Sequence, residues 1–167
     1  MKKIAAVVLG LTLAFSATTA QAALPKCTSS QVFSINSQAS VVKSYQQTVT
    51  NDTKKNNDLQ VIFKNATAKV ADLQAKITAS QQKIAGYLAN VAKNLKSSPS
   101  IARGYQSNAD SETRNLNGYL SSFKWANSDL ATASKNSASA LATLTRSQAS
   151  LATQQKTLDN LKSKCTL

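Results

Sequence analysis

The sequence contains no histidine and a single glutamate, Glu112. General acid–base catalysis usually relies on histidine or on carboxylates held in different environments, and neither pattern occurs here. Two cysteines, Cys27 and Cys165, cannot form a tetrahedral zinc site without further ligands. No glycine-rich phosphate loop or activated serine motif is present either. We therefore expect a protein that is not an enzyme and that needs no metal or cofactor.

Proline and glycine are scarce, with two prolines and four glycines in 167 residues. Because both residues end or weaken helices, their scarcity permits very long ones. Every seventh residue of a first run is apolar except Asn56: Ile35, Val42, Val49, Asn56, Phe63, Val70, Ile77, Ile84, Val91. A second run has the same spacing, with Ser137 as its polar member: Leu116, Phe123, Leu130, Ser137, Leu144, Leu151, Leu158, Cys165. These heptads predict two helices that pack as a coiled coil.

A polar break at residues 96–100 separates the two runs. We predict an all-α fold, a long antiparallel two-helix hairpin with helix one at about 30–96, a turn at about 97–99 and helix two at about 99–164. Two weak stretches, 51–58 and 134–139, would lie at the same height, and they allow an alternative in which the hairpin folds back into a four-helix bundle. Neither stretch contains proline or glycine, which favours the continuous hairpin.

Residues 1–22 have the three parts of a secretory signal peptide. Lys2 and Lys3 precede an apolar stretch from Ile4 to Phe15, and a small-residue cleavage site ends at Ala22. The apolar stretch is shorter than the ~20 residues that a membrane-spanning helix needs, so we expect cleavage near Ala22 rather than an anchor. Residues 23–167 then form a single helical domain. A short basic signal of this kind places that domain in the bacterial periplasm or outside the cell.

An oxidising compartment favours a bridge between the two cysteines. Residues that face each other in the predicted hairpin have numbers that sum to roughly 196. The numbers of Cys27 and Cys165 sum close to that value, so both lie at the open end of the hairpin. We predict that a disulfide between them closes this end.

Without Lys2 and Lys3 the chain has 18 basic and 7 acidic residues, a net charge of +11. Such an excess predicts attraction to an acidic protein, lipopolysaccharide or another envelope polyanion, and it also fits contact with a membrane surface. The alternative is that the charge serves solubility, because an elongated helix exposes much of its surface. Nucleic acid is not favoured, since export separates the protein from most of it and no binding module is recognisable.

A row of lysines flanks the core row of helix one and comprises Lys55, Lys69, Lys76 and Lys83. Flanking charges of this kind are ordinary in coiled coils, and Lys69 could reach Asp129 across the interface. Only Asp129 opposes the row in the predicted register. The alternative is therefore that Lys69, Lys76 and Lys83 form a largely uncompensated strip that binds an acidic ligand.

Trp125 follows the core residue Phe123 by two places and should point outward. It lies beside Lys124, and we expect it near Arg103 and Arg114. An outward tryptophan among basic residues can anchor a partner protein or contact a membrane interface. The alternative is that Trp125 covers a groove or an oligomer interface. Leu120 and Leu141, which flank the core rows, leave room for a homo-oligomer.

These observations favour a non-enzymatic bacterial envelope or secreted protein, with a binding or structural role, that presents a basic helical hairpin to an acidic partner. A first alternative is a periplasmic holdase chaperone that grips unfolded outer-membrane proteins. A second is a secreted adhesin or inhibitor. Aggregation assays with unrelated clients separate the chaperone from a protein with one saturable partner.

Overall fold

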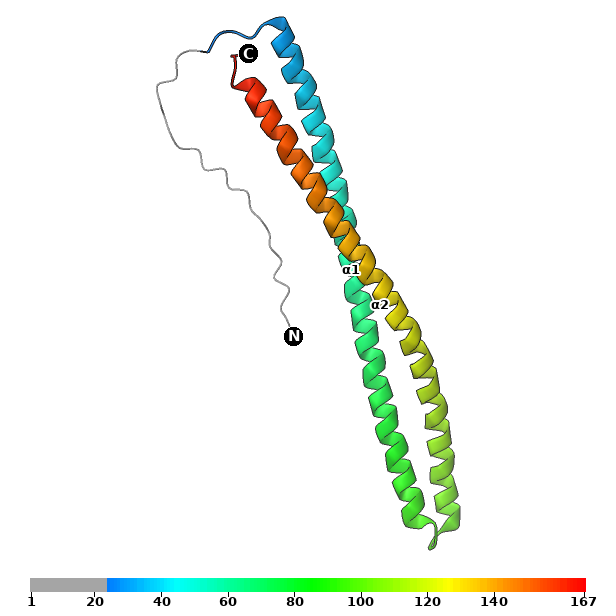
Figure 1. Cartoon of the computed structure of the whole chain (residues 1–167). Helices are drawn as coiled ribbons and strands as arrows, with labels where there is room; N and C mark the ends of the chain where they lie inside the picture. The colour runs from blue at the N-terminus through cyan, green and yellow to red at the C-terminus, as the bar shows by residue number, and fades with distance from the viewer. Residues whose placement is uncertain (1–23) are drawn as a thin grey trace, which may run out of the picture.

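The computed structural model describes residues 24–167. The predicted signal peptide, 1–22, lies outside the described residues. Helix α1, Ser29–Asn94, and helix α2, Pro99–Lys162, run antiparallel along one rod and are joined by a short turn (Figure 1). The 66 residues of α1 span about 99 Å at 1.5 Å per residue. The predicted antiparallel hairpin is confirmed.

Both weak stretches stay helical, so the hairpin is continuous rather than folded into a four-helix bundle. Two polar side chains in the α1 stretch make hydrogen bonds. Asp52 accepts a hydrogen bond from the Ser147 hydroxyl on α2, and the Thr53 hydroxyl donates to the carbonyl of Val49 within α1. A polar residue on the core row is thus satisfied across the interface, and the helix does not need to end there.

The helix ends follow the local chemistry of the sequence. Thr28 caps α1 in a capping box, because its side chain accepts from the backbone N–H of Gln31 and the Gln31 side chain accepts from the backbone N–H of Thr28. Pro99 occupies the first position of α2, where its missing N–H costs nothing. Ser98 precedes it as the N-cap residue, but its side chain makes no capping hydrogen bond.

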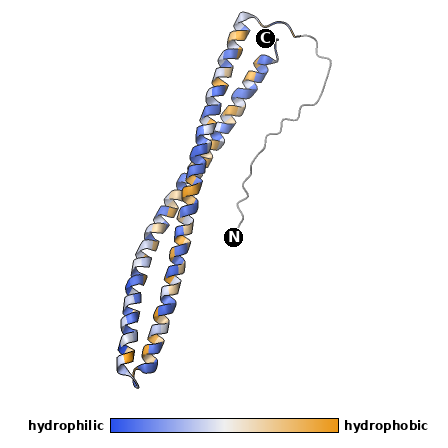
Figure 2. Cartoon of the chain, turned by 180° about the vertical axis from the view of Figure 1, so that it is seen from behind, coloured by the Kyte–Doolittle hydropathy of each residue, from blue (hydrophilic) through white to orange (hydrophobic). Residues whose placement is uncertain are grey.

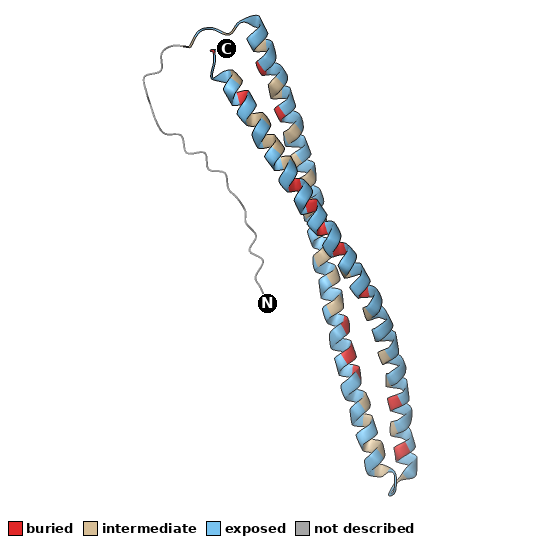
Figure 3. Cartoon of the chain, viewed as in Figure 1, coloured by how far each residue is buried: buried red, intermediate tan, exposed pale blue. Residues whose placement is uncertain are grey.

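The core is a narrow seam between the helices, formed by two rows of residues from each. All the heptad positions of the two predicted runs are buried or half-buried, and Figure 3 shows such residues where the helices face each other. Ile35, Val42 and Ile77 are the most buried large side chains of α1. On α2 many of the buried residues are small, among them Ala126 and Ala133.

Polar pairs interrupt this seam at three levels. Gln38 donates to the side chain and the carbonyl of Gln154. Asp52 accepts from Ser147, and farther toward the turn the Ser80 hydroxyl donates to Glu112 at 2.6 Å. At a fourth level, Asn56 has a buried Oδ1 atom without a hydrogen-bond partner. Polar layers cost stability but fix the register of two helices.

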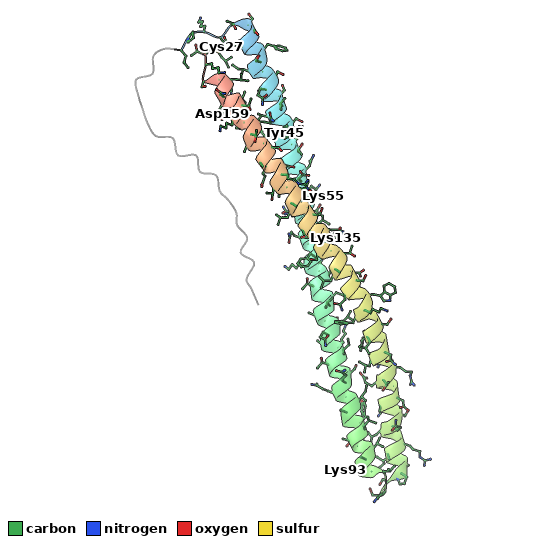
Figure 4. The ribbon with its side chains drawn as sticks, viewed as in Figure 1. Cys27, Tyr45, Lys55, Lys93, Lys135 and Asp159 are labelled. Atoms are coloured by element: carbon green, nitrogen blue, oxygen red, sulfur yellow. A yellow bond between two sulfur atoms is a disulfide. The ribbon has the colours of Figure 1, made fainter. Side chains whose placement is uncertain are left out.

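The open end is closed as predicted by a disulfide between Cys27 and Cys165, with their Cα atoms 4.9 Å apart. Figure 4 shows Cys27 at this end, where a short parallel bridge joins Lys26 to Thr166. Two backbone bonds, from Cys27 N–H to the Thr166 carbonyl and from Thr166 N–H to the Pro25 carbonyl, complete the bridge. Cys165 packs with Ile35, Val42 and Leu158 in a compact apolar cluster. Covalent closure and apolar burial thus coincide at one end of the rod.

Polar residues cover most of the outer surface, and apolar residues are scattered among them (Figure 2). Neither α1 nor α2 contains a stretch long and apolar enough to cross a membrane.

Candidate interaction surfaces

Two carboxylates, Asp52 and Glu112, lie on the seam between the helices. To act as a catalytic acid–base pair, both would have to reach one substrate. Asp52 is bound by Ser147, and Glu112 is bound by Ser80 on α1. Ser80 and Asp52 are 28 residues apart on one helix, about 42 Å, so the two carboxylates cannot act on one substrate. Their serine partners instead explain why each is tolerated in the seam.

The pKa of Glu112 lies below its ordinary value. The main cause is the hydrogen bond from the Ser80 hydroxyl, which stabilises the carboxylate, and Asn115 and Lys83 act in the same direction against the cost of burial. Within residues 24–167, no group of three or more His, Cys, Asp or Glu side chains could hold a metal ion.

The lysine row lies on one side of the hairpin, which we call the lysine edge: Lys55, Lys69, Lys76 and Lys83 of α1 with Asp129 of α2. Lys69 approaches Asp129 at 3.9 Å, as the register predicts. Lys76 pairs with Asp72 at 2.8 Å one turn earlier in α1, and Lys83 lies 4.0 Å from Glu112. The expectation that only Asp129 opposes this row was therefore wrong. The expectation missed the i,i+4 pair of Lys76 with Asp72, and it missed that the Glu112 side chain extends from the seam toward Lys83.

Trp125 is 69% exposed, so the prediction that it points outward is confirmed. The structure does not place it near both arginines. Along the continuous helix α2, Arg114 is about 16 Å from Trp125 and Arg103 about 33 Å away, while Lys124 is its direct neighbour. The four residues therefore do not form one cluster. Trp125 and Lys124 remain as a pair on the shaft of the hairpin.

The end of the hairpin at the turn carries a surface that the sequence analysis did not single out. We call it the tip and define it as Leu95, Ile101, Lys93, Lys96 and Arg103. Leu95 and Ile101 are 60% and 51% exposed, and Figure 4 shows Lys93 at this end of the rod. The segment 73–109, which contains the tip, has no aspartate or glutamate. The tip therefore joins exposed aliphatic side chains to three cations that have no carboxylate within 4.0 Å in the described part of the chain.

One signal in the sequence could have revealed the tip. Leu95 and Ile101 are apolar, but they lie off the seam rows and beside a break that was already recognised as a turn. Three tyrosines between the middle of the rod and the turn, Tyr87, Tyr105 and Tyr119, are by contrast half-buried on the seam rows, so packing occupies them.

A shallow groove follows the lysine edge in the middle of the rod. Two adjoining hollows that share Asn136 form it. Ala126, Ala133 and Ala140 line it on α2, because small side chains there leave space beside the seam. On α1 it is lined by Leu59 and Ile62, with Lys55 and Lys69 along it.

Fold and surfaces together define a class of protein: a disulfide-closed, strongly basic helical hairpin without an enclosed ligand site among its described residues. The chain matches no protein-family model, no curated protein and no solved structure.

Proposed function

We propose that this protein is a non-enzymatic, exported binding protein of the bacterial envelope, and that its basic hairpin engages an acidic partner through the tip. One observation carries the proposal. Of the 18 basic residues left without Lys2 and Lys3, three have a carboxylate within 4.0 Å. The unneutralised charge exceeds what a surface needs for solubility, and Lys93, Lys96 and Arg103, in the acid-free segment 73–109, have no carboxylate within 4.0 Å.

The tip suits such a partner better than the lysine edge does. Lys69, Lys76 and Lys83 already have acidic neighbours, so an acidic ligand there would have to compete with Asp129, Asp72 and Glu112. Lys93, Lys96 and Arg103 have no such neighbours, and Leu95 and Ile101 add apolar contact area. A surface that combines cations with exposed aliphatic groups attracts anionic ligands that also have an apolar part, such as lipopolysaccharide or an acidic protein.

The test compares two variants with equal loss of charge. The tip variant carries Lys93→Gln, Lys96→Gln and Arg103→Gln, and the shaft variant carries Lys43→Gln, Lys64→Gln and Lys135→Gln, all at exposed positions. Binding is measured with purified lipopolysaccharide and by capture from envelope extracts, at low and high salt. We expect the tip variant to lose at least tenfold in affinity and the shaft variant to lose much less. Equal losses would mean that net charge alone acts, and binding that is indifferent to salt would refute an acidic partner.

A second function, holdase chaperone, is favoured by the groove on the lysine edge. Its alanine lining and the 52% exposed Ile62 could receive an extended apolar segment of an unfolded client, with Lys55 and Lys69 close by. Suppression of aggregation of several unrelated unfolded outer-membrane proteins, lost in Ile62→Glu and retained in the tip variant, would move this function to first place. No suppression would dismiss it.

A further inference from the structure

The side of the hairpin opposite the lysine edge is almost free of charge. The 3.9 Å contact of Lys69 with Asp129 shows that these two flanking rows lie on one side, so the other flanking rows of both helices lie together on the opposite side. We call that side the neutral edge. Its α1 row is Ala39, Gln46, Thr53, Gln60, Thr67, Gln74, Gln81, Leu88. Its α2 row is Gln106, Thr113, Leu120, Asn127, Ser134, Leu141, Gln148, Gln155. Lys162, the last residue of α2, continues the α2 row one heptad after Gln155 and is the charged residue on these two rows.

An uncharged edge is unusual for this chain. Flanking rows of coiled coils generally carry charge, and this chain has a net charge of +11 outside residues 1–22. A second copy that approached the lysine edge would bring like charges together. On the neutral edge it meets glutamine, threonine and leucine side chains, which can pair with one another across an interface. The distribution of charge therefore favours the neutral edge over the lysine edge as a contact surface between two copies.

The exposed leucines of α2 add a geometric argument. Leu120 and Leu141 are 44% and 51% exposed, and they lie three heptads apart on the same row, about 31 Å along the helix. The midpoint between them falls between Leu130 and Ala131, which is also the midpoint of α2, Pro99–Lys162. A two-fold axis through this point, perpendicular to the rod, brings Leu120 of each copy opposite Leu141 of the other copy. It also aligns the two rods over their whole length.

The middle of the neutral edge offers further apolar surface. A shallow hollow at this level of α1 is lined by Gln60, Val61, Phe63 and Thr67, together with Lys64, and Val61 is 57% exposed. The edge follows the 64 residues of α2 for about 96 Å, and a strip roughly 10 Å wide amounts to about 1,000 Å² per copy. A standard stable interface buries about 800 Å² per partner, so the area is sufficient.

We infer that two copies of this chain pack side by side and antiparallel through their neutral edges, with Leu120 of each copy against Leu141 of the other. The dimer is a four-helix bundle in which both lysine edges face outward and one tip projects at each end. A dimer of this form would present two tips about 100 Å apart, so it could bridge two acidic partners.

The first test is the mass of the oxidised protein by sedimentation equilibrium, because an elongated shape distorts elution volume. We expect the mass of two chains at tens of micromolar for the wild type and of one chain for Leu120→Glu/Leu141→Glu. The matched control is Ile62→Glu/Ile101→Glu, which makes the same change at residues of similar exposure on the flanking rows of the lysine edge, and it should stay dimeric. Circular dichroism verifies that both variants remain helical. A monomeric wild type, or dissociation by the control variant but not by the leucine variant, would overturn the proposal.

The second test concerns orientation. Leu120→Cys and Leu141→Cys are oxidised separately and as an equal mixture, and covalent dimers are read on a non-reducing gel. In the antiparallel dimer only the mixture forms a covalent dimer, because two copies of one variant place their new thiols about 31 Å apart. Cross-linking of each variant with itself would show a parallel arrangement, and no cross-linking in any sample would show that this edge is not the interface. Either result refutes the inference.

Discussion

Reduction of the Cys27–Cys165 disulfide should destabilise this hairpin strongly, and the structure indicates how strongly. The bond closes a loop with a sequence separation of 138 residues. In the chain-entropy model, a loop of this length stabilises the folded state by about 5 kcal/mol. Loss of that contribution lowers the melting temperature by roughly 10–20 °C for a chain of this size.

The loss of stability on reduction should be concentrated at the open end of the hairpin. Cys165 packs with Ile35, Val42 and Leu158, and this cluster holds the open end together. A long hairpin opens from its ends, since each layer of the seam contacts its neighbours only. Amides around Ile35 and Leu158 should therefore lose protection from hydrogen exchange on reduction, whereas those around Ile77, about 63 Å farther along α1, should keep theirs.

The assay is thermal unfolding followed by circular dichroism at 222 nm, with and without reductant, together with hydrogen exchange at 25 °C. Cys27→Ser/Cys165→Ser is the control: it should melt like the reduced wild type and should not respond to reductant. A shift of less than about 3 °C on reduction would refute the reasoning, because it would mean that the loop contributes little to the free energy of unfolding. Equal loss of hydrogen-exchange protection along the whole rod would refute the argument that reduction opens only this end.

Three further predictions concern the seam and the shaft. Asn56→Leu should raise stability by about 1–2 kcal/mol, because it removes a buried Oδ1 atom that has no hydrogen-bond partner, and a lower denaturation midpoint would contradict this. The folded-state pKa of Glu112 lies below its unfolded value, so its stabilisation is complete above the unfolded pKa and is lost as the pH falls through the folded pKa. The melting temperature of the wild type should thus fall more steeply than that of Glu112→Gln from about pH 5 to about pH 3, and parallel curves would remove this role from Glu112. Trp125→Ala should change the free energy of unfolding by no more than about 0.5 kcal/mol, given an exposure of 69%, and a loss of several kcal/mol in a urea titration would show that the indole is packed.

The main features of the fold follow from spacing in the sequence. The heptad rows from Ile35 to Val91 and from Leu116 to Cys165 predict which residues face the seam, and the break before Pro99 predicts where the chain reverses. Those two facts also bring Cys27 and Cys165 together and turn Trp125 outward. Periodicity is a local property that each helix carries by itself, which explains why it can be read without knowledge of the partner helix.

Contacts between side chains of different helices, unlike periodicity within one helix, were decided only by the tertiary structure. In the stretch 51–58, Asp52 is satisfied by Ser147 from the other helix, a contact that the sequence of α1 alone does not specify. Whether the lysines of the lysine edge have acidic neighbours depended on how far the Glu112 side chain extends from the seam toward Lys83. The spacing of the rows does not specify that reach.

The sequence by itself thus determined the rod, its closure and its net charge. The packed hairpin decided which cations are paired, namely Lys69, Lys76 and Lys83, and which long edge is almost free of charge. The physical reason is that net charge is a sum over residues, whereas compensation depends on distances of a few ångströms between groups on different helices.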